Sequence, residues 1–207
     1  VDPNSTNPYQ LTEADRTVIG NTTPKFSGGF GLNATYKGFD MSMFFNFMYD
    51  FDVLNANKIM LTTWADNKEN NFLMDIASDK RWRNFDDMGN EIRYSPEILA
   101  EFNKNATMWN PTSIGRPICM SYAVEDGSFL RLNSATLGYT LPSVWTKKVG
   151  LSKVRFYVSG NNLFTLTGYS GYDPEVSTAG SNPMTPGLDW GAYPKSKVFT
   201  FGLDIQF

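Results

Sequence analysis

The sequence contains no histidine and only one cysteine, Cys119, among its 207 residues. The missing imidazole excludes histidine metal sites, Ser-His-Asp and Cys-His catalysis, and a histidine pH switch. A single cysteine also excludes an internal disulfide. No apolar run approaches the ~20 residues of a membrane-spanning helix. The first residues, VDPNSTNPYQ, lack the basic and apolar regions of a signal peptide.

Charge is scarce and nearly balanced. Charged residues make up 19% of the chain and the formal net charge is -3. No basic excess indicates a nucleic-acid partner, and no acidic block is typical of an interaction tail. Aromatic residues, in contrast, reach 15%, and there are 17 glycines. This combination of strand formers and turn formers favours an all-β chain.

Five stretches alternate apolar and polar residues, the pattern of a strand with two different faces. The clearest is FTFGLDIQF, residues 199–207, in which every odd-numbered residue is apolar. The third stretch is irregular around Asn133, which indicates a β-bulge. The expected strands cover residues 25–36, 39–51, 129–141, 153–167 and 198–207.

Short and long connections alternate along the chain. Lys37-Gly38 joins the first two strands, and residues 142–152, with room for one helical turn, join the third and fourth. Two long loops, residues 52–128 and 168–197, make the other connections. An antiparallel meander would therefore place every short turn at one end and every long loop at the other. Within the first loop, Ser95-Pro96 is typical of a helix start.

The apolar faces of these strands can point either into a protein core or into lipid, and these two possibilities correspond to two architectures. A soluble β-sandwich buries them, but its strands are usually ~5 or 6 residues long. The expected strands span about 9 to 15 residues, against the ~9 to 11 that cross a bilayer. Charge is confined to the opposite faces, at Lys25, Asp40, Asp50, Arg131, Arg155 and Asp204. Because Arg or Lys facing lipid costs about 2 to 4 kcal/mol, the pattern favours an antiparallel transmembrane β-barrel. A soluble β-sandwich that binds glycans is the alternative.

Five strands do not close a barrel. Bacterial single-chain barrels have an even number of strands, at least ~8, and open edges in lipid leave backbone groups unpaired. We therefore expect the chain to be the C-terminal segment of a larger barrel. Short turns would face the periplasm and the long loops the outside, which places Phe207 at the interfacial aromatic girdle.

Four strings, in this order, resemble the closing portion of the SusC/RagA-type TonB-dependent transporters of the Bacteroidetes outer membrane. They are IGNTTPKFSGGFGLNATYKGFDMSMFF, VEDGSFLRLNSATLGYTLP, VRFYVSGNNLFTLTGYSGYDPEV and the terminal FTFGLDIQF. The resemblance implies a barrel of about 22 strands, an amino-terminal plug, and a SusD-type surface lipoprotein that acts as a lid. It also implies import of oligosaccharides or, in some members, peptides, with energy from TonB.

No residue here matches the plug or the TonB box, so TonB would act through a part of the transporter that is missing from this chain. Phe207 corresponds to the terminal aromatic that the barrel-assembly machinery recognises in the family. The resemblance implies a Gram-negative outer-membrane location, no enzyme activity and no cofactor or metal.

Two groups of residues are candidates for contacts with substrate or lid. Exposed loop aromatics can stack on sugars or pack on a partner, and the alternative is that they form small cores that hold the loops in shape. These loop aromatics are Trp64, Trp82, Trp109, Tyr169, Tyr172 and Trp190. Polar residues expected inside the barrel can contact a hydrated substrate or one another: Arg131, Asn133, Arg155 and Asn161. The string GYDPE, residues 171–175, reads as a structural turn, with a divalent-ion site as the alternative.

Overall fold

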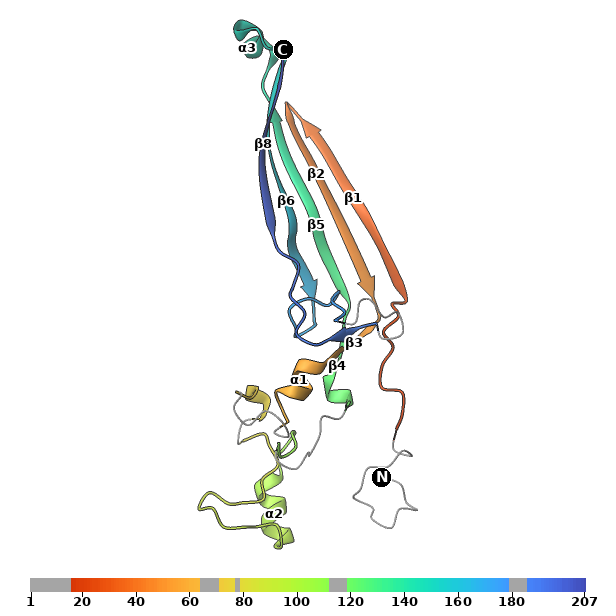
Figure 1. Ribbon diagram of the computed structural model, residues 1–207, viewed down its shortest axis with the longest axis vertical. Helices are drawn as coiled ribbons and strands as arrows, with labels where there is room; N and C mark the ends of the chain where they lie inside the picture. The colour runs from red at the N-terminus through yellow and green to blue at the C-terminus, as the bar shows by residue number, and fades with distance from the viewer. Residues whose placement is uncertain (1–15, 64–70, 77–78, 112–118, 179–185) are drawn as a thin grey trace.

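The computed structural model describes residues 16–63, 71–76, 79–111, 119–178 and 186–207. A five-stranded antiparallel sheet dominates it, in the order β1-β2-β5-β6-β8. Figure 1 shows this sheet as one long layer, with both of its short connections at the upper end. The sheet strands are β1 Phe26–Tyr36, β2 Phe39–Tyr49, β5 Phe129–Thr140, β6 Lys153–Thr167 and β8 Val198–Gln206. Each differs from its expected range by no more than two residues at an end.

The remaining elements belong to the connections. The short one between β5 and β6 holds the helical turns α3 Ser143–Thr146 and η4 Lys147–Val149. The loop end holds β3 Asp52–Asn55, α1 Ala56–Met60, η2 Met74–Ile76, α2 Pro96–Asn103, η3 Ser121–Ala123, β4 Val124–Asp126 and β7 Leu188–Asp189. Among the described residues, no helix is both long and apolar enough to cross a membrane.

The register keeps the apolar residues of neighbouring strands on one face, because directly opposed residues share a face. Phe30 pairs with Phe45, and their rings stack with centroids 4.9 Å apart. Phe45 in turn pairs with Leu132. This aromatic face is open to the surroundings, and Phe201 on β8 is 80% exposed.

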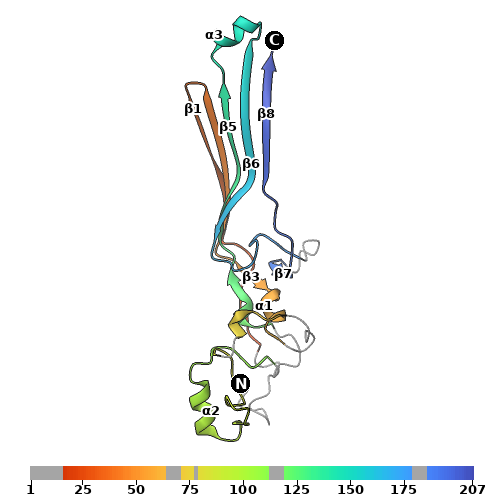
Figure 2. The same ribbon diagram turned by 90° about the vertical axis from the view of Figure 1, so that its left-hand side faces the viewer.

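The soluble β-sandwich alternative requires a second sheet over that aromatic face, and the described residues contain none. The only other sheet there is small, with the order β4-β3-β7. Figures 1 and 2 place it beyond the loop end of the long sheet and not across its face. The long sheet is therefore a single-layer wall, as expected for a barrel segment.

A compact core lies at the loop end of the sheet. It consists of Phe51, Val53, Phe129 and Tyr169. The strand expected over residues 39–51 would place Phe51 on its apolar face by continued alternation, and this expectation was wrong. Asp50 adopts a left-handed conformation with φ of 60°, which ends β2 and turns Phe51 inward, where it is 7% exposed.

The bulge expected in the third strand is present. In the pairing of β2 with β5, the consecutive residues Phe45 and Phe44 face Leu132 and Ser134, so Asn133 is the additional residue. This shift moves Ser134 to the polar face, whereas uninterrupted alternation had grouped it with Leu130 and Leu132.

Candidate functional site

The polar face of the sheet carries an arginine that joins three strands. Arg155 on β6 donates to Asp40 on β2 through Nε and Nη2, at 2.9 and 2.6 Å. Its Nη1 lies 3.3 Å from Oδ2 of Asp204 on β8. To reach Asp40 the side chain crosses β5 at Gly138, where an added Cβ would lie 2.5 Å from Nη2 of Arg155. The absence of a side chain at Gly138 makes this bridge possible.

The second predicted arginine, Arg131, lies at the loop end of the same face and is 2% exposed. Its Nη2 is 2.5 Å from Oδ1 of Asp173, and its Nη1 is 2.9 Å from Oε2 of Glu175. Nε donates to the Thr165 hydroxyl at 3.1 Å. Lys195 contacts Glu175 at 2.7 Å. The carboxylates of GYDPE therefore bind Arg131 and fix the β6–β8 loop to the wall.

The two predicted asparagines lie near the bulge, between the level of Arg131 and that of Arg155 along the sheet. Asn133 is the bulged residue of β5 opposite β2. Asn161 pairs with Ser134 and with Val198, and its side chain is exposed. Neither asparagine contacts Arg131 or Arg155 in the hydrogen bonds of the described residues, so the structure separates the predicted polar set into two charged ends and an uncharged middle.

Two of the predicted loop aromatics pack inside the loop region. The Trp109 ring meets Tyr122 edge-on at 5.1 Å, and its indole donates to the Thr62 carbonyl at 3.1 Å. Tyr169 is 6% exposed and donates its hydroxyl to Asp189 at 2.7 Å. Burial, followed by the hydrogen bond to Asp189, raises the pKa of the Tyr169 phenol. Both aromatics hold loop segments that are distant in sequence.

Three other predicted aromatics remain open to the surroundings. Trp82 is 41% exposed, Trp190 56% and Tyr172 85%. Trp82 lines a hollow of about 320 Å³ together with the neighbouring residues 81–86, Asn110 and Pro111. Trp64 lies outside the described residues. Exposed apolar rings at one end of a molecule are typical of a contact surface.

A carboxylate that the sequence did not single out, Glu125 on β4, organises the small sheet. It accepts from the Ser170 backbone and hydroxyl at 2.9 and 2.8 Å, and from Asn55 at 3.0 Å. Lys58 lies 3.2 Å away. Burial opposes ionisation, but these hydrogen bonds outweigh it and hold the pKa of Glu125 below its usual value. Its partners are 45 and 70 residues away, so no local pattern marked it.

The comparisons with known proteins agree with this wall-and-loop arrangement. TonB-dependent receptor P3 of Formosa agariphila is 36% identical to this chain over 202 residues, which cover 96% of the chain. TonB-dependent receptor SusC of Bacteroides thetaiotaomicron is 36% identical over 90 residues, 42% of the chain and 8% of SusC. The RagAB peptide importer in its closed-closed state matches 96% of the chain with a TM-score of 0.71, at 22% identity. This chain belongs to the SusC/RagA-type TonB-dependent receptors.

No protein-family model matches the chain. It spans less than a fifth of the proteins it matches here, 18% of TonB-dependent receptor P3 and 19% of the RagAB chain. The five-stranded sheet is therefore a segment of a transmembrane barrel wall. Its outer strands, β1 and β8, are the edges at which the rest of a SusC/RagA-type barrel continues.

The last predicted site residue, Phe207, follows β8 and is 91% exposed. Figure 1 places the C-terminal end beside α3, at the end of the wall that carries the short connections. Phe207 thus lies at the level of the short connections, and its role stays a prediction.

Proposed function

We propose that this chain forms part of an outer-membrane, TonB-dependent importer of oligosaccharides or peptides in a Gram-negative bacterium of the Bacteroidetes. The observation that carries the proposal is the continuous similarity to TonB-dependent receptors over 96% of the chain, on a barrel-wall fold. The chain performs no covalent chemistry in this proposal. It supplies wall and loops, and TonB delivers energy through a part of the transporter outside this chain.

The loop end is the proposed contact region for cargo and for a SusD-type lipoprotein lid. Trp82, Tyr172 and Trp190 offer exposed rings there, and aromatic side chains are enriched at protein interfaces. The lid is supported by the likeness to the RagAB peptide importer and to SusC. RagAB is named as a peptide importer, but that name describes RagAB alone. The proposal for this receptor therefore includes both oligosaccharides and peptides.

The luminal polar residues have a separate proposed role. Asn133 and Asn161 lie near the bulge, between the two charged ends, and are the proposed contacts for hydrated cargo. Arg131 and Arg155 are proposed to shape the wall, because their guanidinium groups are already bound by carboxylates of the chain.

Uptake by the intact receptor tests the function. The receptor gene is deleted from the chromosome. Uptake of labelled oligosaccharides and labelled oligopeptides is then compared between the deletion strain, the parent strain and a strain without functional TonB. We expect loss of one cargo class in the deletion strain and an equal loss without TonB. Unchanged uptake of every oligosaccharide and peptide in the panel would contradict the proposal.

A matched pair of variants tests the lid surface. Trp190→Ala and Tyr172→Ala remove exposed rings at the loop end, so we expect less lipoprotein to copurify with the receptor. Phe201→Leu changes an exposed ring on the membrane face and should leave copurification unchanged. Equal recovery of the lipoprotein from all three would remove these rings from the lid contact.

A further inference from the structure

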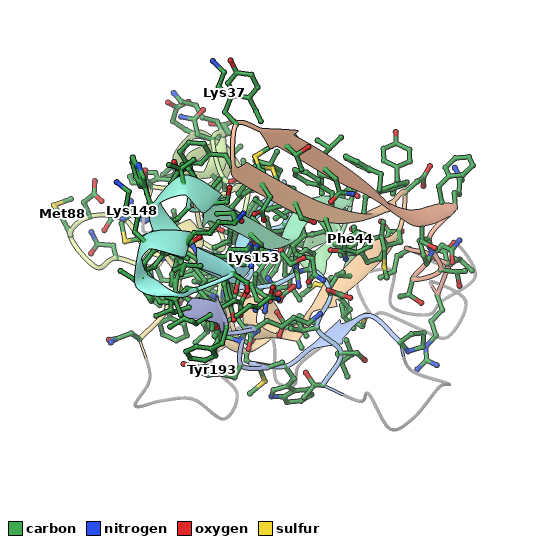
Figure 3. All side chains as sticks on the ribbon, turned by 90° about the horizontal axis from the view of Figure 1, so that it is seen from above. Lys37, Phe44, Met88, Lys148, Lys153 and Tyr193 are labelled. Atoms are coloured by element: carbon green, nitrogen blue, oxygen red, sulfur yellow. The ribbon has the colours of Figure 1, made fainter. Side chains whose placement is uncertain are left out.

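The end of the wall opposite the loops is basic. Lys37 lies in the β1–β2 turn, and Lys147 and Lys148 lie in the β5–β6 connection. We call these three residues the basic rim. The chain as a whole carries a net charge of -3, so the basic rim is a local excess against the overall charge. Viewed from this end in Figure 3, Lys37 and Lys148 project outward from the ribbon.

The lysines of the basic rim lack carboxylate partners within the described residues. At the loop end, by contrast, Lys58, Lys104 and Lys195 each lie 2.6 to 3.2 Å from a carboxylate. Lys37 lies in a tight turn beside Gly38 and has a φ of 46°. Its ammonium group is 5.2 Å from the centre of the Tyr36 ring. Three ammonium groups are thus available to an external anion.

Apolar side chains surround the basic rim at the same level. In the β5–β6 connection, Val144 is 68%, Trp145 60% and Val149 70% exposed. Across the wall, Tyr36 is 69% exposed, and the rings of Phe39 and Tyr139 meet at 4.5 Å. Exposed Trp and Tyr beside Lys are typical of segments at the boundary between acyl chains and headgroups.

The polar, inner face of the sheet also carries charged residues, and its arginines are paired with carboxylates of the chain. Lys153 is the first residue of β6, two residues before Arg155, and shares its face. Arg155 is bound by Asp40 and Asp204. Figure 3 shows Lys153 toward the middle of the projection and Lys148 toward its margin. The basic rim is therefore distinct from the luminal charge network.

We propose that the basic rim is a binding site for anionic phospholipid, with Lys37, Lys147 and Lys148 contacting headgroup phosphates and Trp145, Val144 and Val149 entering the acyl region. The occupant follows from charge complementarity, because headgroup phosphates supply the anion that the lysines lack. The position of the basic rim also supports a lipid, because the aromatic face of the wall ends at the level of these lysines. A lysine near an anionic membrane surface favours binding about fivefold. The inference rests on the proposed membrane location but not on the cargo or the lid.

The test uses the intact receptor in detergent micelles and phosphatidylglycerol or phosphatidylcholine as the probe. Native mass spectrometry measures how many of each lipid remain bound. We expect the wild-type receptor to prefer phosphatidylglycerol, and the preference to fall at ~0.5 M salt, where charges are screened beyond ~4 Å. Substituting all three lysines in K37Q/K147Q/K148Q should lower the preference at least about fivefold.

Two matched variants separate charge from folding. K37R/K147R/K148R keeps the charges and should keep the preference. K80Q/K104Q/K197Q removes three lysines of the loop end and should also keep it. The proposal is overturned if wild type shows no salt-sensitive preference, if the glutamine rim variant keeps its preference, or if the loop-end variant loses as much. Should the rim variant fail to assemble, the salt titration of wild type and the arginine variant decide. A receptor absent from the outer-membrane fraction would instead contradict the proposed function.

Discussion

Replacing Arg131 with Met should release the β6–β8 loop from the wall. The guanidinium is 2% exposed and contacts Asp173 and Glu175 at 2.5 and 2.9 Å. Removing it leaves Asp173 as a buried carboxylate, and the loss of one partner from a buried ion pair costs about 3 to 5 kcal/mol. Glu175 keeps Lys195 at 2.7 Å, and Asp173 keeps the Glu175 backbone N–H at 3.0 Å. We therefore expect the lower end, about 3 kcal/mol.

Hydrogen exchange of the intact receptor in micelles measures this change. A loss of about 3 kcal/mol raises the equilibrium for local opening by about two orders of magnitude. Amides of residues 168–178 should therefore exchange faster in Arg131→Met. The Asp86–Asn90 hairpin, closed by its own hydrogen bonds, should exchange as in wild type and is the internal control.

The double variant Arg131→Met, Asp173→Asn isolates the cause. It removes the uncompensated charge, so it should recover part of the protection that Arg131→Met loses. Unchanged exchange in residues 168–178 would refute the assigned role of the ion pair. Faster exchange of equal size in the Asp86–Asn90 hairpin would also refute it, because the effect would then be general unfolding.

Three further variants test other contacts. Gly138→Val places a side chain where Arg155 crosses β5, so its thermal midpoint should fall, whereas Gly168→Ala meets no atom within 4 Å and should leave it unchanged. Phe51→Ala should weaken the loop-end core by about 3 to 5 kcal/mol, seen as faster proteolysis there, and wild-type resistance would contradict its burial. Tyr169→Phe leaves Asp189 short of a donor and should cost about 1 to 3 kcal/mol. Because the pKa of Tyr169 is raised, its contribution to the free energy of unfolding is complete below about pH 10 and declines above it. If Tyr169→Phe lost stability above about pH 10 in the same way as wild type, this assignment would be contradicted.

The long strands were predictable because their pattern repeats over many residues. β6 runs for 15 residues and its alternation survives the register shift opposite the β5 bulge, so its bounds follow from the sequence. The family resemblance was confirmed by the similarity to receptor P3 and SusC. The same periodicity misled at Phe51, since nothing in the alternation signals that Asp50 adopts a left-handed conformation.

The loop region was less predictable because its contacts are distant in sequence. The strands β3, β4 and β7 are four, three and two residues long, too short for a period to register. Arg131 was identifiable as a residue of the inner face, but its partner Asp173 lies 42 residues away. GYDPE could be read as a turn, although its role as a receptor for a buried guanidinium depends on the tertiary fold.

The two faces of β8 provide the most direct test that this sheet is a transmembrane wall. Single cysteines are placed along residues 200–205 of the intact receptor after Cys119→Ser, and each is spin-labelled in a lipid bilayer. Odd-numbered positions such as Phe201 and Leu203 should be accessible to oxygen dissolved in lipid and shielded from a water-soluble nickel chelate. Even-numbered positions such as Thr200 and Asp204 should show no lipid exposure. Loss of this alternation, or odd-numbered positions shielded from both reagents, would contradict the account.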